Sequence, residues 1–249
     1  MFYIKSKLTA LIVVIHVFYY RIKANKHEKK IIDVCTNYEF STTTKIHLWH
    51  LLSLFKKINK KIIIENFVEC GVWKGIYLVF FQKLIEHYNL KNNNIYAFDT
   101  YEGIPEPSSL DETCDGKPMY ERYQNLKLGK NTSSWNNTSL NEVEKNYFQN
   151  TLLNKNLIPI KGMVENTLVE KKNIPEKISI LKLDTCLYEG TKIELEVLFP
   201  KVQSGGLVII DNYSNFKGVK RAVQEFFTND NNNIIKYHTI LGRVVVIKK

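Results

Sequence analysis

The sequence predicts an α/β fold in which a mostly parallel sheet is covered by helices on both faces. From about residue 61 onward, short apolar and β-branched runs alternate with segments of helical periodicity, which is typical of parallel strands joined by crossover helices. Several of these runs end in an acidic residue or glycine, as strand ends beside a ligand site do. The chain closes with two β-rich runs separated by Leu241-Gly242, which predict an antiparallel hairpin.

Composition narrows the classes of protein. The 249 residues are 44% hydrophobic and 24% charged, which is enough to bury a sizeable core and excludes disordered, collagenous and low-complexity chains. The formal charge of +10 would suit nucleic acid, an acidic membrane or a phosphorylated substrate. Because the lysines are scattered along the chain, we expect no nucleic-acid partner. The four cysteines lie far apart, which predicts neither a zinc site nor a disulfide framework and favours the reducing cytoplasm.

Residues 1–30 are predicted to form a segment in front of a single domain at 31–249. Residues 8–20 are an apolar run with basic flanks, shorter than the roughly 20 residues that a membrane-spanning helix needs. Three interpretations stay open: a helix packed on the domain or on a partner subunit, a peripheral membrane anchor, or a signal or spanning segment. The location is therefore cytoplasmic, with membrane association through the N-terminus as the alternative.

The spacing of apolar residues predicts each element of the domain in turn. Strands are expected at 62–71, 94–99, 157–162, 178–184 and 207–211. Helices are expected at 42–57, 72–88, 139–150, 188–201 and 219–227. Ser139 and Glu142 have the spacing of a capping box. Residues 101–138 show no steady period and predict a long functional loop, which would form a substrate lid.

The loop after the first strand, Glu69 to Gly75, carries two glycines, Gly71 and Gly75. Trp73 stands where a dinucleotide-binding loop has its middle glycine, so a pyrophosphate site is disfavoured. Glu69 could bind an ammonium group, and S-adenosylmethionine has an ammonium and no phosphate. A plain strand–helix turn with a surface Glu is the alternative. Asp99, which ends the next strand, could accept hydrogen bonds from two ribose hydroxyls.

Two later strands also end in oxygen-bearing side chains. Asp184 ends one of them, and Asp211 and Asn212 end the other. Two carboxylates and an amide oxygen suit Mg²⁺ or a similar divalent ion. The alternative is that the two aspartates cap the helices that follow.

Five segments in order resemble the macrocin O-methyltransferase (TylF-like) family over about residues 62–228: ECGVWKG (69–75), FDTYEGIPEP (98–107), SLNEVEKNYF (139–148), LKLDTCLYEGT (181–191) and SGGLVIIDNY (204–213). The resemblance implies a Rossmann-like class I methyltransferase fold, with a seven-stranded sheet that ends in the antiparallel hairpin. It also implies Mg²⁺-dependent methyl transfer from S-adenosylmethionine to a sugar hydroxyl of a small molecule or glycan.

The resemblance assigns roles to individual residues. The cofactor would contact Glu69, Cys70, Gly71, Val72 and Gly75 at its methionine part, Asp99 and Thr100 at the ribose, and Gly162 and Met163 near the adenine. The metal ligands would be Asp184, Asp211 and Asn212, and the catalytic positions Asp184 and Cys186. It leaves open whether the protein forms a homodimer.

Two positions depart from the family pattern. The family usually has Asp where this chain has Asn212, and its presumed general base, also Asp, is replaced by Cys186. A thiol has a reference pKa near 8.5 and could act as base only if a metal or cation lowered it. Three explanations stay open: a metal-bound hydroxyl that needs little base, an inactive enzyme, or another base from the lid, for which the candidates are Glu102, Asp111, Glu112 and Asp115. Two other functions therefore also stay open, namely a cofactor-binding protein without turnover and a membrane-associated component of a glycan pathway.

Overall fold

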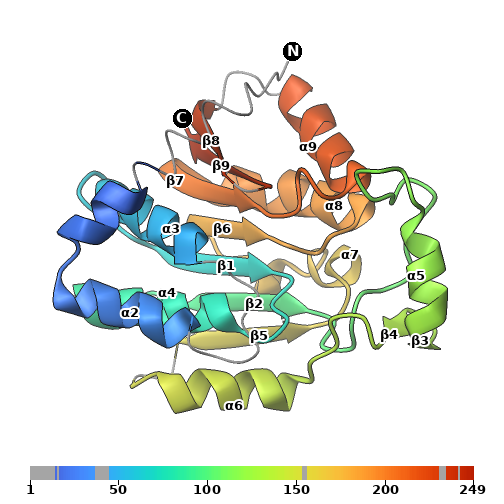
Figure 1. Cartoon of the computed structure of the whole chain (residues 1–249), viewed down its shortest axis with the longest axis horizontal. Coiled ribbons are helices and arrows are strands. Elements are labelled where there is room, and N and C mark those ends of the chain that lie inside the picture. Colours follow the sequence, from blue (N-terminus) through green and yellow to red (C-terminus); the bar gives the residue numbers. More distant parts are fainter. Residues whose placement is uncertain (1–14, 16, 37–44, 153–155, 230–233, 241) are drawn as a thin grey trace.

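The computed structural model describes residues 15, 17–36, 45–152, 156–229, 234–240 and 242–249, with side chains undescribed at 229 and 234–240. Its centre is a seven-stranded sheet with the strand order β5-β2-β1-β6-β7-β9-β8 (Figure 1). The parallel strands are β1 (Asn66–Cys70), β2 (Ile95–Asp99), β5 (Leu157–Lys161), β6 (Ile178–Leu183) and β7 (Val202–Ile210). Every residue of β6 is buried, as expected for a central strand covered on both faces.

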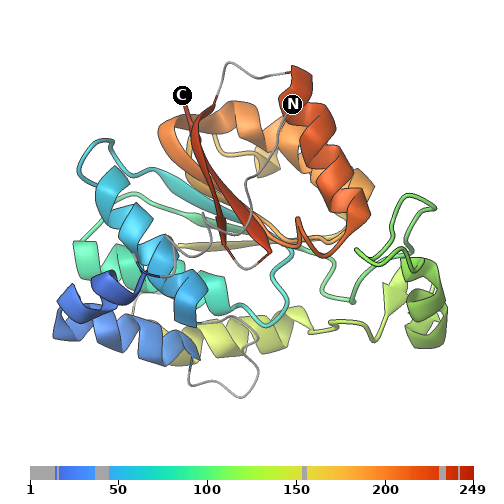
Figure 2. The same ribbon diagram turned by 45° about the horizontal axis from the view of Figure 1, so that its top comes forward.

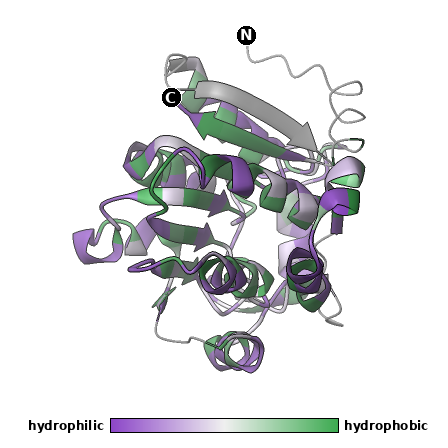
Figure 3. Cartoon of the chain, turned by 90° about the vertical axis from the view of Figure 1, so that its left-hand side faces the viewer, coloured by the Kyte–Doolittle hydropathy of each residue, from purple (hydrophilic) through white to green (hydrophobic). Residues whose placement is uncertain are grey.

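The sheet ends in an antiparallel pair, β8 (Ile234–Ile240) and β9 (Arg243–Lys248), and β9 also pairs antiparallel with β7. Figure 3 shows the hydrophobic residues of β9 lying against the body of the domain. The predicted fold class and the C-terminal hairpin are therefore confirmed.

Helices cover both faces of the sheet and enclose two cores (Figures 1 and 2). One core lies under α2 (Lys26–Thr36), α3 (Lys45–Ile58), α4 (Ile76–Tyr88) and α6 (Leu140–Asn150). The other lies under α7 (Val164–Thr167), α8 (Tyr188–Leu198) and α9 (Lys217–Asn229). The short 3₁₀ helices Lys171–Asn173 and Phe199–Lys201 complete this face. The capping box of α6 is confirmed, because Glu142 accepts a hydrogen bond from the Ser139 backbone N–H while its own N–H donates to the Ser139 hydroxyl.

Two predicted boundaries are wrong for a backbone reason. The helix expected from residue 72 begins at Ile76, because Gly71, Trp73 and Gly75 have φ of 81°, 46° and 80°, which no α-helix accommodates. The strand expected at 207–211 begins earlier, at Val202, so Gly205-Gly206 lies inside β7, where the pairing with β6 shifts register between Ile178 and Ile180. The glycine pair thus marks an irregularity within the strand.

The predicted lid at 101–138 is more ordered than a long loop. It contains α5 (Met119–Leu126) and a small hairpin of β3 (Lys127–Gly129) and β4 (Thr132–Ser133). Buried Asp111 fastens it to the domain, because its carboxylate accepts hydrogen bonds from Ser108 N at 2.8 Å and from Tyr188 N, at the start of α8, at 2.7 Å. Figures 1 and 2 show α5 at the end of the molecule opposite α2.

The N-terminal part of the chain packs on the first core. Residues 17–23 are helical and lead into α2, which contacts α3 and α4, so the predicted boundary at residue 30 falls inside a helix. Most of the apolar run at 8–20 and the first residues of the predicted helix at 42–57 lie outside the described residues. Among the described helices, none has the length and apolar character that crossing a membrane requires.

Candidate active site

A cavity of about 480 Å³ lies at the carboxyl ends of β1, β2, β6 and β7. This is where ligands bind in open α/β sheets. Of the residues proposed from the sequence, those that line the cavity are Glu69, Gly71, Val72, Asp99, Thr100, Gly162, Met163, Asp184, Cys186, Asp211 and Asn212. The strand-end reasoning thus brought most of the proposed residues to one place.

Cys70 and Gly75 do not line the cavity. The Cys70 side chain is fully buried in the second core because it points to the opposite face of β1 from its neighbour. Gly75 lies where α4 begins, and a Cβ there would come within 3.1 Å of the Val143 side chain on α6. Both residues therefore have packing roles.

The Gly71 loop is fixed against the strand that carries Asp184. A Cβ at residue 71 would lie 2.4 Å from the carbonyl oxygen of Asp184, and the φ of Gly71 is left-handed, so only glycine fits. The Asp184 N–H donates to the Cys70 carbonyl at 2.8 Å, which continues the strand pairing into the loop.

Asp99 holds the same loop from the other side. Its carboxylate accepts hydrogen bonds from Val72 N at 2.6 Å, Trp73 N at 3.0 Å and Tyr101 N at 2.7 Å. Burial raises the pKa of Asp99, although these three N–H groups favour its ionised form. Asp99 is therefore the acceptor that shapes the turn as well as a residue of the cavity wall.

A buried lysine that the sequence reasoning missed lies at the centre of the site. Lys182 Nζ lies 2.6 Å from Asp184 Oδ2, 3.2 Å from Glu69 Oε1 and 3.3 Å from Asp211 Oδ2, with 1% of its side chain exposed. Burial by itself would lower the pKa of Lys182, but the three carboxylates outweigh it and hold the pKa above its usual value. The signal in the sequence was a charge within the apolar run ISILKLD.

Arg243, the first residue of β9, is a second buried cation that the sequence reasoning missed. Its guanidinium pairs with Asp211 and donates a hydrogen bond to the Tyr77 hydroxyl. Burial raises the pKa of a carboxyl, yet Arg243 and Lys182 hold the pKa of Asp211 below its usual value. Burial and the charge of Asp211 raise the pKa of the neighbouring Asp184 to about 7.

Glu69, like Asp211, has a buried carboxylate oxygen without a hydrogen-bond partner, but the Asp211 oxygen still forms an ion pair with Lys182. Glu69 Oε1 pairs with Lys182, but Glu69 Oε2 is buried without a hydrogen-bond partner. Burial raises the pKa of Glu69 to about 8. A buried carboxylate oxygen without a partner is costly, so a cationic ligand in the cavity would stabilise it.

The surroundings of Cys186 disfavour a thiolate. Its sulfur lies 3.2 Å from Asn212 Nδ2 and 3.4 Å from the Asp184 carbonyl oxygen. Burial first, and then the charges of Asp184 and Asp211, raise the pKa of Cys186 well above that of an ordinary thiol. Without a further cation beside it, Cys186 therefore stays protonated near neutral pH. A role as base, which would require a metal or another cation to lower this pKa, stays a prediction.

The four lid carboxylates offered as replacements lie outside the cavity lining. Glu102 pairs with Lys161 at 2.7 Å, Glu112 with Lys217 at 2.7 Å and Asp115 with Lys117 at 3.3 Å. Asp111 is occupied by the backbone of the lid and of α8. The lid instead contributes Trp135 and Arg122, which both line the cavity. The Arg122 guanidinium carbon lies 4.2 Å from the centre of the Trp135 ring. His47 of α3 also lines the cavity, which sequence reasoning did not anticipate.

Two of the proposed metal ligands touch directly, and Lys182 links one of them to the third. Asn212 Nδ2 lies 2.7 Å from Asp184 Oδ1, and Lys182 bridges Asp184 and Asp211. Turning the Asn212 amide would present its oxygen to the same point, so the donor set suits a hard cation. Lys182 and Arg243 already offset part of the negative charge. Within the described residues, no three His, Cys, Asp or Glu side chains are arranged to hold a metal ion.

Comparison with known proteins identifies the family of this chain. The family model for Macrocin-O-methyltransferase (TylF) matches residues 20–240. The chain is similar to demethyldecarbamoylnovobiocin O-methyltransferase of Streptomyces niveus, with 27% identity over 65% of this chain and 57% of that protein. It is also similar to mycinamicin III 3''-O-methyltransferase of Micromonospora griseorubida, with 24% identity over 64% of this chain and 59% of that protein. The matches thus span less than two thirds of the relatives' length.

The solved structure of the O-methyltransferase NovP superposes with a TM-score of 0.70 at 21% identity, covering 97% of this chain and 99% of that one. The structure of CalS11, a calicheamicin methyltransferase, superposes with a TM-score of 0.54 at 17% identity, covering 92% of this chain and 96% of that one. At these identities the two structures support the fold alone. Because the family model spans most of the sequence, this chain belongs to the macrocin O-methyltransferase family.

Proposed function

We propose that this protein transfers a methyl group from S-adenosylmethionine to a hydroxyl of a sugar. The observation that carries the proposal is the buried Oε2 of Glu69, which has no partner and lies in the wall of the cavity beside the Gly71 loop. The family supports the reaction. The relatives support the acceptor, since one is named as a mycinamicin 3''-O-methyltransferase and another as methylating a rhamnosyl tetracenomycin.

The cofactor would lie along the carboxyl ends of β1 and β2. Glu69 would bind its ammonium group, and Asp99 and Thr100 would accept hydrogen bonds from its ribose while Asp99 keeps its loop contacts. Gly162 and Met163 would line the adenine end. Related folds have been solved with S-adenosylhomocysteine, among them the O-methyltransferase from Bacillus cereus, at 13% identity and a TM-score of 0.53.

We further propose that Asp184, Asp211 and Asn212 hold Mg²⁺ or a similar divalent ion beside the cofactor. The contact between Asn212 and Asp184, and the position of all three residues in the cavity wall, support this set. When bound, such an ion orients the acceptor and lowers the pKa of its hydroxyl. Lys182 would keep the two carboxylates in place and prevent their mutual repulsion from opening the site.

His47 is our candidate for the group that takes the hydroxyl proton. It lines the cavity and lies close enough to Asp211 to affect that carboxylate electrostatically, so its neutral imidazole would lie on the acceptor side. An imidazole titrates near neutral pH, which suits a general base. The methyl transfer cancels a positive sulfonium and a negative alkoxide, so much of the rate would come from alignment in a site that Trp135 and the lid shield from water.

The proposal is tested by calorimetric titration with S-adenosylhomocysteine. Replacing Glu69 with Gln should weaken binding at least about tenfold, since a hydrogen bond to a charged group contributes roughly 1.5–3 kcal/mol. Glu65→Gln is the matched control, because Glu65 lies just before the opposite end of β1 and pairs at 3.9 Å with Lys177. Equal affinities for the wild type and Glu69→Gln would exclude this cofactor site.

A methyl-transfer assay tests the metal and the acceptor. Methyl transfer to nucleotide-linked and glycoside sugars should require a divalent ion and be lost in Asp184→Ala. If transfer is unaffected by a chelator, the metal proposal is wrong while the cofactor site stands.

A cofactor-binding protein without turnover is the second candidate, and the neutral Cys186 thiol favours it. It predicts normal binding of S-adenosylhomocysteine but no transfer to any sugar, and gain of transfer in Cys186→Asp. In either case we propose the cytoplasm as the location, because Cys35, Cys70, Cys114 and Cys186 are all free thiols.

A further inference from the structure

The helix formed by residues 17–23 carries an exposed apolar face. Its residues Phe18, Tyr19 and Ile22 are 63%, 53% and 64% exposed, and Ile15, just before it in the chain, is 59% exposed. Their spacing of three and four residues places them on one side of a helix. Large apolar side chains gathered in this way are unusual on a monomer's surface and mark an interaction site.

The opposite face of this helix is fixed to the domain. Val17 and Ala24 are buried in the first core, and the Tyr20 ring lies 6.4 Å from the Trp49 ring on α3. Lys56 lies over the same Tyr20 ring at 5.0 Å. The helix is therefore docked, and its apolar face is held outward.

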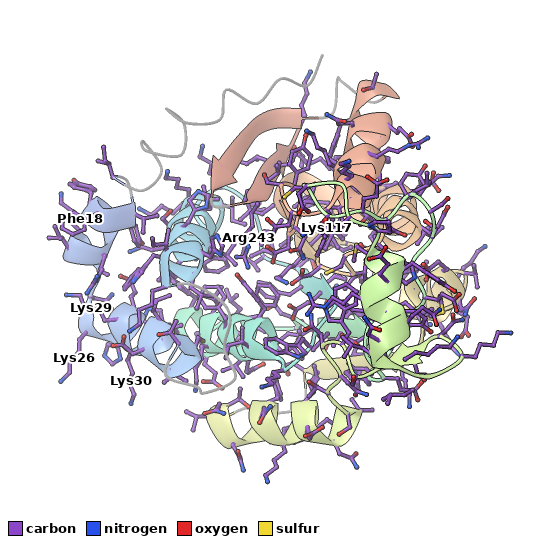
Figure 4. The ribbon with its side chains drawn as sticks, turned by 45° about the vertical axis from the view of Figure 1, so that its right-hand side comes forward. Phe18, Lys26, Lys29, Lys30, Lys117 and Arg243 are labelled. Carbon is purple, nitrogen blue, oxygen red and sulfur yellow. The ribbon has the colours of Figure 1, made fainter. Side chains whose placement is uncertain are left out.

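Five exposed cations lie on the same helix and on α2, the next helix along the chain. They are Arg21, Lys23, Lys26, Lys29 and Lys30. The two acidic residues nearby are both engaged by other lysines, Glu28 with Lys56 at 2.6 Å and Asp33 with Lys45 at 3.1 Å. Within the described part of the chain, none of the five cations has an ion-pair partner. Figure 4 shows Phe18, Lys26, Lys29 and Lys30 projecting from the same side of the molecule, whereas Arg243 lies inside it.

We propose that this N-terminal surface, made of the four apolar residues and five cations named above, docks on a membrane that contains anionic lipids. Apolar side chains that enter the headgroup region and cations that contact lipid phosphates are the two parts of peripheral membrane binding. A second copy of this chain is the poorer occupant, because a symmetric contact would bring two sets of the same five cations together. The inference does not depend on the proposed function.

The position of the surface sets the orientation of the bound protein. In Figure 1 α2 lies at the opposite end of the sheet from α5. A molecule that rests on the membrane through its N-terminal surface would therefore hold the lid away from the lipid. Acceptors would enter the cavity from the aqueous side.

The test is co-sedimentation of the full chain with vesicles of phosphatidylcholine alone or with phosphatidylglycerol added. We expect binding only to the anionic vesicles, weakened at least about tenfold between roughly 0.05 M and 0.5 M salt. Replacing Lys26, Lys29 and Lys30 with Gln should weaken binding at least about tenfold. Replacing Phe18 and Ile22 with Ser should do the same.

The matched control is Val169→Ser with Lys171→Gln, which changes an exposed apolar residue and an exposed lysine elsewhere on the surface. It should bind like the wild type, and calorimetric binding of S-adenosylhomocysteine should be the same in all variants. Equal binding to neutral and anionic vesicles, or wild-type binding by the Phe18 and Ile22 variant, would overturn the proposal. A wild-type dimer in sedimentation velocity that the same variant dissociates would instead assign the surface to self-association.

Discussion

Glu69 and Asp99 lie near the ends of adjacent parallel strands, yet their carboxylates are used in opposite ways. The carboxylate of Asp99 is satisfied by three backbone N–H groups, so it shapes the loop that follows β1. Glu69 shares one oxygen with Lys182 and leaves the other buried without a partner. An acidic strand end is thus a structural element where backbone donors reach it, and a receptor for a cation where they do not.

The largest expected effect is a loss of stability when the cation that pairs with Glu69 is removed. Lys182→Met would leave Glu69, Asp184 and Asp211 without their shared cation, and breaking a buried ion pair costs about 3–5 kcal/mol. Urea unfolding should show this loss of stability, while Lys177→Met, at an exposed pair, should change it by less than about 1 kcal/mol. If the Lys182 variant is as stable as the control, the charge cluster is not held together as described.

Substitutions of Asp99 should affect stability mainly through the loop that follows β1. Asp99→Ala removes the acceptor for the N–H groups of Val72, Trp73 and Tyr101, and each unsatisfied buried donor costs about 1–3 kcal/mol. Since this loop is partly open to the cavity and water, we expect a total loss of about 2–3 kcal/mol. Asp99→Asn, which keeps one acceptor oxygen, should lose less. Equal losses in the two variants would contradict the role given to the hydrogen bonds.

The pH dependence of stability should separate the two carboxylates further. Because burial raises the pKa of Glu69 to about 8, the folded protein binds a proton that the unfolded chain releases near pH 4.5. The stabilisation from this proton is present below the unfolded pKa and is lost as the pH rises through the folded pKa. The melting temperature of the wild type relative to Glu69→Gln should therefore fall between about pH 5 and about pH 9. A constant difference would show that Glu69 is ionised throughout.

The smallest effect is expected at Cys186. Because its thiol stays neutral, Cys186→Ala should change kcat/KM by less than about threefold, or under 1 kcal/mol. Steady-state methyl transfer measures this directly. A loss of about a hundredfold or more would instead make the thiol a participant in the proton transfer.

The sequence allowed the fold and most of the site to be predicted, for one reason. The ends of parallel strands meet at one edge, so Asp99, Asp184 and Asp211 could be placed together from their positions in the chain alone. Gly71 and the capping box at Ser139 could also be predicted from the sequence, because each is required by local backbone geometry.

The cations of the site could not be predicted in the same way. Lys182 lies inside a strand, and only the tertiary fold reveals that three carboxylates surround it. Arg243 and His47 come from distant parts of the chain, and nothing in their local sequence places them at the cavity. The family resemblance assigned Cys70 to the cofactor, and alternation along β1 turns its side chain to the other face of the sheet.

The contact between Gly71 and the Asp184 carbonyl carries a consequence for evolution and engineering. The turn that would receive the methyl donor and the strand end that would receive the sugar touch backbone to backbone, with room for a hydrogen atom alone. Neither segment can be remodelled separately, so new acceptor preferences in this scaffold should arise from the lid, which takes no part in that backbone contact.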